Sequence, residues 1–99
     1  MRLTPLQIQS IRKATLDVVG PTARVRLFGS RLEDTARGGD IDLLLECNDC
    51  VSEPALLAAR LAARVSRAMG GRKVDVVIRA PNLPELPIHT IAAKEGILL

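Results

Sequence analysis

Three aspartates occur inside short apolar runs that are typical of β-strands. Asp40 and Asp42 lie in residues 40–46, and Asp75 lies in residues 73–79. Aspartate is depleted from strands, so its repeated use there needs a reason. Side chains two residues apart on a strand point to the same face, so Asp40 and Asp42 present two carboxylates together. Carboxylates held this closely repel each other, and a bound cation removes that penalty.

This arrangement favours a magnesium site. Carboxylate oxygens are hard ligands that suit Mg²⁺, and substrate phosphates commonly complete its coordination. We therefore predict that Asp40 and Asp42 bind metal, joined by Asp75 if its strand presents it on the same face. The alternative is a solvated structural pair at a strand start, with Asp75 a single surface carboxylate.

The dipeptide Gly29-Ser30 follows an apolar run, residues 25–28, and suits a phosphate site. Ser30 and Glu33 have the spacing of a helix capping box, which predicts a short helix beginning at Ser30. Glycine lets a ligand approach the backbone closely, and a helix N-terminus offers free N–H groups to a phosphate. A plain turn followed by an N-cap is the alternative, and it is compatible with phosphate binding because the cap presents those N–H groups.

Several charged residues are weaker candidates. Arg31 is the best placed to contact a triphosphate, and Arg26 and Lys73 are also candidates, although each alone is more typical of a solvated charge. His89, the one histidine, is expected to be structural because nothing pairs it with a nucleophile.

Taken in order, these motifs resemble a known family. Gly29-Ser30, a spacer of nine residues and then Asp40 and Asp42 in an apolar strand are similar to the nucleotidyltransferase fold of the DNA polymerase β superfamily. The closest resemblance is to its minimal nucleotidyltransferase (MNT) domains. The spacer is slightly shorter than is usual in that family, which predicts a tighter loop. The family has a third carboxylate on a later strand, and Asp75 fits that position.

The resemblance runs from about residue 25 to residue 78 and implies the roles of six residues. The implied catalytic residues and ligands of two Mg²⁺ ions are Asp40, Asp42 and Asp75. The implied contacts to ATP are Gly29, Ser30 and Arg31.

The resemblance also implies a partner. MNT domains pair with a HEPN-domain protein, typically a toxin ribonuclease, and act as the antitoxin by adding AMP to a tyrosine of that partner. The implied function is therefore AMP transfer from ATP to a hydroxyl of a HEPN toxin. A non-catalytic module that neutralises its partner by steric contact is the alternative. A small-molecule transferase is less favoured, because that group normally has a second helical domain.

Composition and periodicity predict the fold. A length of 99 residues with 47% hydrophobic residues indicates one globular domain, residues 1–99. Helical periodicity predicts a helix after the N-cap Thr4, another after the N-cap Ser52, and a third over residues 89–95. The strand–helix–strand order of residues 40–79 predicts a parallel crossover. The expected fold class is α/β, a small mixed sheet of three to four strands with helices mainly on one face.

Charge, aromatic content, the length of apolar runs and the number of cysteines mainly exclude classes of function. The net charge is +3, yet Phe28 is the only aromatic residue, so we expect no direct nucleic-acid binding by base stacking. No apolar run reaches membrane-spanning length and no signal peptide is apparent, so we expect a cytoplasmic protein. Cys47 and Cys50 have no second cysteine pair, which disfavours zinc, and are expected to be reduced thiols. A homo-oligomer or hetero-oligomer is compatible with the sequence.

Overall fold

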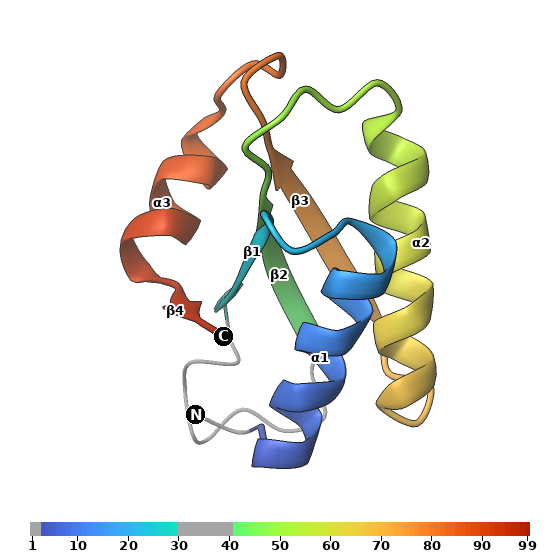
Figure 1. Ribbon diagram of the computed structural model, residues 1–99. Coiled ribbons are helices and arrows are strands. Elements are labelled where there is room, and N and C mark those ends of the chain that lie inside the picture. The colour runs from blue at the N-terminus through green and yellow to red at the C-terminus, as the bar shows by residue number, and fades with distance from the viewer. Residues whose placement is uncertain (1–2, 30–40) are drawn as a thin grey trace.

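A computed structural model describes residues 3–29 and 41–99 (Figure 1). In these ranges the elements follow one another as α1 (Pro5–Val18), β1 (Arg24–Phe28), β2 (Ile41–Glu46), α2 (Pro54–Ala68), β3 (Val74–Arg79), α3 (Pro87–Glu95) and β4 (Ile97–Leu98). The strands form one mixed sheet in the order β3-β2-β1-β4. β1 is antiparallel to both of its neighbours, whereas β2 and β3 are parallel and joined by α2. The predicted α/β class and parallel crossover are confirmed.

The helices cover the two faces of the sheet unequally. α1 and α2 pack on one face, and the shorter α3 lies against the other (Figure 1). The alternation of side chains along β2 supplies both cores. Ile41, Leu43 and Leu45 face α1 and α2, whereas Leu44 packs with Phe28 beneath α3. β2 is thus buried on both faces, which explains its nearly continuous apolar sequence.

The helix starts show which local signals decide an element boundary. At α1 the predicted N-cap Thr4 is confirmed, and it forms a capping box in which the Gln7 N–H donates to Thr4 Oγ1 at 3.1 Å and the Thr4 N–H donates to Gln7 Oε1 at 2.9 Å. At α2 the predicted N-cap Ser52 is wrong. The N-cap is Glu53, which makes no side-chain capping hydrogen bond. Pro54 favours the first helical position, so the cap falls on the residue directly before it.

Leu43→Ala is expected to lower the free energy of unfolding by about 3 kcal/mol. The Leu43 side chain is fully buried between the sheet and the two long helices, and its truncation leaves a cavity that the neighbours fill only partly. Urea denaturation measures the change. Leu6→Ala is the matched control, because Leu6 is 75% exposed and should change stability by less than about 0.5 kcal/mol. Equal effects of the two variants would contradict this assignment of the core.

The predicted helix at Ser30 lies outside the described residues. No helix within the described ranges has the length and apolar character needed to cross a membrane.

Candidate active site

Two of the three predicted carboxylates are neighbours in the sheet. Asp42 pairs with Asp75 in the parallel register of β2 and β3. Paired residues on adjacent strands lie about 5 Å apart and point to the same face. The Ile41 N–H donates to the Lys73 carbonyl oxygen at 3.0 Å, which fixes the starts of the two strands at one level. The structure therefore brings Asp42 and Asp75 together on the α3 side of the sheet.

Gly29 lies directly beside Asp42. It follows the last residue of β1, Phe28, which pairs with Asp42 across the sheet. The φ angle of Gly29 is +77°, in the left-handed region that favours glycine. A Cβ atom at this position would overlap Asp42 Oδ2 and would lie 3.2 Å from Asp42 Cγ. The missing side chain thus makes room for the carboxylate as well as for any phosphate that approaches the turn.

Solvent reaches this end of the sheet. Gly29 and Asp75 are exposed, and Asp42 is partly buried. On the same face, the cluster of Phe28, Leu44 and Ala92 packs α3 against the strands beyond the carboxylates. The carboxylate pair therefore lies at a solvent-accessible edge of the sheet, which we call the carboxylate rim.

The other predicted contacts divide into two groups. Ser30, Arg31 and Asp40 lie outside the described residues. Arg26 is engaged elsewhere, because its Nε atom is 2.6 Å from Glu46 Oε1. Lys73 is exposed and immediately precedes β3, two residues from Asp75. Lys73 therefore stays a candidate contact, whereas Arg26 is held by Glu46.

The donor set fits a hard divalent cation. Within the described ranges, no group of three His, Cys, Asp or Glu side chains is arranged to hold a metal. Asp42 and Asp75 supply two carboxylates, and Asp40, which immediately precedes β2, is the third candidate ligand. Carboxylates on one face of adjacent strands, open to solvent, match the preference of Mg²⁺ for a few protein oxygens together with substrate phosphates.

Comparison with known families gives the chain a family assignment. A family model described as "Nucleotidyltransferase domain" matches residues 8–98. The chain belongs to the nucleotidyltransferase domain family. The resemblance inferred from the motifs is therefore confirmed, and membership supports transferase activity.

Curated proteins and solved structures provide further comparisons for this nucleotidyltransferase domain. No curated protein matches the sequence significantly. Among solved structures, the chain is similar to one from a crystal structure of a mutant of the toxin–antitoxin complex MntA-HpeT, with a TM-score of 0.65 and 20% sequence identity. The match covers 93% of this chain and 69% of that chain. At this identity the similarity shows a shared fold.

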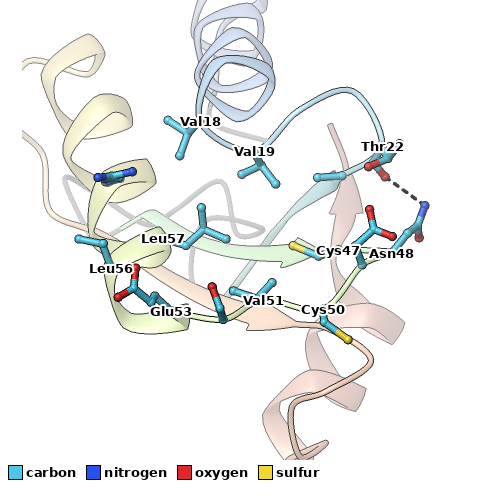
Figure 2. A pocket seen from close by; sticks show the side chains of 14 residues that line it. Val18, Val19, Thr22, Cys47, Asn48, Cys50, Val51, Glu53, Leu56 and Leu57 are labelled. Carbon is cyan, nitrogen blue, oxygen red and sulfur yellow. Dashed lines mark hydrogen bonds between the residues drawn. The ribbon is translucent and has the colours of Figure 1, made fainter.

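A separate pocket of about 290 Å³ lies at the far end of the nucleotidyltransferase sheet (Figure 2). It lies where β2 ends, between the C-terminal end of α1 and the N-terminal end of α2. Both cysteines line it and are free thiols. Figure 2 shows the Cys47 sulfur directed toward Leu57 and Val51, whereas the Cys50 sulfur points away. The pocket is at the opposite end of β2 from Asp42, so it is not part of the carboxylate site.

The Cys47 thiol is expected to react with iodoacetamide several-fold more slowly than the exposed Cys50 thiol at neutral pH. Burial raises the pKa of the Cys47 thiol, and the nearby Asp49 carboxylate raises that pKa further. Since the thiolate is the reactive form, alkylation of Cys47 should accelerate as the pH rises toward this raised pKa. Peptide mass spectrometry against time at several pH values measures both rates. Equal rates at neutral pH would contradict the prediction.

His89 has a structural contact in this nucleotidyltransferase domain. Its side chain is buried, and its Nδ1 atom accepts a hydrogen bond from the Leu86 N–H at 2.9 Å. This bond satisfies a donor at the start of α3, where Leu86 has no capping side chain of its own. The contact agrees with the structural role expected from the sequence.

Proposed function

We propose that this chain transfers AMP from ATP to a tyrosine hydroxyl of a HEPN-domain toxin and thereby acts as its antitoxin. The observation that carries the proposal is the pairing of Asp42 with Asp75 directly beside Gly29. Membership of the nucleotidyltransferase family supports the reaction class. The fold similarity to a protein from a toxin–antitoxin complex supports the kind of partner. The proposal includes a cytoplasmic location for both proteins.

The proposed chemistry assigns a role to each motif. Asp40, Asp42 and Asp75 would hold two Mg²⁺ ions, which supply charge neutralisation at the triphosphate and acidify the attacking hydroxyl. The backbone at Gly29 and Ser30 would hold the β- and γ-phosphates, so that the α-phosphorus lies in line with the hydroxyl. Arg31 would add a positive charge beside these phosphates.

The proposed covalent step forms one bond to the α-phosphorus and breaks another. The tyrosine oxygen forms a bond to the α-phosphorus while the bond from that phosphorus to the bridging oxygen of the β-phosphate breaks. Pyrophosphate leaves, and Asp75 accepts the hydroxyl proton. Asp75 suits this role because it is the exposed member of the pair.

The side chains favour a protein acceptor over a nucleic acid. Phe28 is the only aromatic residue in the sequence, and it is 8% exposed within the cluster beneath α3. Proteins that bind single-stranded nucleic acid usually stack bases on exposed aromatic side chains. This chain has none to offer, so an acceptor recognised through protein surface contacts suits it better.

Intact-mass measurement of the partner tests the proposal. The protein encoded beside this chain, which we propose to be a HEPN-domain toxin, is incubated with the chain, Mg²⁺ and ATP, and peptide fragmentation then locates any modified residue. The expected result is a gain of AMP on a tyrosine that requires both the chain and ATP. If the bound partner never gains AMP under these conditions, the proposed reaction is wrong.

A further inference from the structure

An apolar groove with a basic rim lies between α1 and the edge of the sheet. Its volume is about 630 Å³, and its lining comes from α1, the turn before β1, and the β1 and β4 strands. Leu16 of α1 is 53% exposed and Leu98 of β4 is 51% exposed. Large apolar side chains that share one hollow are typical of an interaction site, whereas isolated ones need no explanation.

The charged residues described on the rim of this groove are all basic. Arg12 and Lys13 come from α1 and Arg24 begins β1, and all three are exposed. Among residues 3–29 and 41–99, no acidic residue lines the groove. Within the described part of the chain, none of the three cations takes part in an ion pair, whereas Arg26, Arg64 and Arg79 each do. The three positive charges are therefore available to an incoming ligand.

The strand beside the groove is also suited to contact. β4 is the outermost strand next to β1 in the sheet formed by the described residues (Figure 1). The Leu99 N–H donates to the Val25 carbonyl oxygen at 3.0 Å, which holds this segment against β1. Ile97 is 41% exposed. An edge strand leaves some backbone groups open to another chain, although a strand of two residues offers only a few of them.

We propose that this groove docks an amphipathic segment of the partner protein, with apolar side chains against Leu16 and Leu98 and acidic side chains against Arg12, Lys13 and Arg24. Charge selects this occupant over a second copy of the chain, because two such grooves brought together would oppose like charges. The inference rests on the proposed function only in taking the acceptor protein as the partner.

Docking at the groove leaves the carboxylate rim accessible. Arg24 is the first residue of β1, whereas Gly29 follows its last residue, so the groove and Gly29 lie toward opposite ends of that strand. A strand of this length spans roughly 15 Å. The partner can thus be held at the groove while a separate segment of it carries the tyrosine to Asp42 and Asp75.

Isothermal titration of the protein encoded beside this chain, the proposed HEPN-domain partner, tests the docking surface, with AMP transfer measured separately. Arg12→Glu/Arg24→Glu is expected to weaken the affinity about tenfold or more and to reduce its salt dependence. Leu16→Ser is expected to weaken it about tenfold, because a half-exposed leucine would lose its contact. The matched controls are Arg60→Glu/Arg67→Glu on α2, with the same charge change, and Leu6→Ser on α1.

The outcomes separate the docking surface from the proposed reaction. Weakened binding in the groove variants alone, with both controls near wild type, supports the docking surface whether or not AMP is transferred. Wild-type affinity in the groove variants overturns the docking surface, even if AMP transfer occurs. Failure of the wild-type chain to bind this protein also overturns it. Tight binding without AMP transfer rejects the proposed reaction alone.

Discussion

Asp42→Asn is expected to lower the rate of nucleotidyl transfer by about 10²–10³-fold. Asparagine has nearly the same shape as aspartate, so it should fit beside Gly29, but it lacks the negative charge that holds a divalent cation. Asp42 is paired with Asp75 and partly buried, so the loss removes one of two carboxylates at the rim. Single-turnover transfer from labelled ATP, with Mg²⁺ in excess, measures the change.

Asp49→Asn is the matched control for this variant. Asp49 is exposed in the loop after β2, beside the pocket at the other end of the sheet. Its substitution should leave the transfer rate unchanged. A wild-type rate in Asp42→Asn would contradict the assignment of the site. Neutralisation of the toxin by Asp42→Asn as efficient as by wild type, with the complex intact, would favour the non-catalytic binding module.

Gly29→Ala is expected to reduce transfer by about 10²-fold, because the new methyl group forces the Asp42 carboxylate from its place and small displacements of catalytic groups are costly. The overlap is with Asp42 Oδ2, and the backbone there has a φ of +77°. The backbone strain should also lower the free energy of unfolding by about 1–2 kcal/mol. Transfer rate and urea denaturation are measured on the same preparation.

Gly70→Ala separates these two effects. Gly70 has a φ of +72°, but nothing lies within 4 Å of a Cβ built there. It should therefore lose a similar amount of stability and keep the wild-type transfer rate. If Gly29→Ala and Gly70→Ala were equally active, the placement of Asp42 would not depend on Gly29.

Local patterns were sufficient to predict β1, β2 and β3 and the start of α1, whereas the predicted start of the third helix at residue 89 is wrong because α3 begins at Pro87. The apolar run after Asp40 predicts a buried strand. In the structure both faces of that strand, β2, are covered. The capping box at Thr4 forms because its donors and acceptors are three residues apart in the chain. The predicted N-cap Ser52 is wrong because Pro54 occupies the first helical position, which makes Glu53 the N-cap.

The arrangement of the site depended on features that the sequence does not encode locally. Whether Asp75 lies beside Asp42 depends on the register of β3 against β2, and a slip of one residue would turn Asp75 to the opposite face. That register depends on where the α2 crossover ends. The closeness of Gly29 to the carboxylate likewise follows from the pairing of β1 with β2.

The sequence predicts the groove even less well than the arrangement of the carboxylates. Leu16 and Leu98 are more than eighty positions apart, and they line one hollow because β4 returns to pair with β1. Residues 97–99 are all apolar, which is compatible with a place in the core or at an interface. In the structure, Leu99 packs against the core between the sheet and α1 and α2, while Leu98 remains exposed in the proposed docking groove.

The position of the transferred phosphorus tests the central claim most directly. ATP labelled at either the α- or the γ-phosphate is incubated with Mg²⁺, this chain and the HEPN-domain protein, with Asp42→Asn and a metal chelator as controls. We predict protein-bound label from the α-position alone, lost in both controls. Label from the γ-position would show phosphoryl transfer and contradict nucleotidyl transfer at this site, as would the absence of label from both.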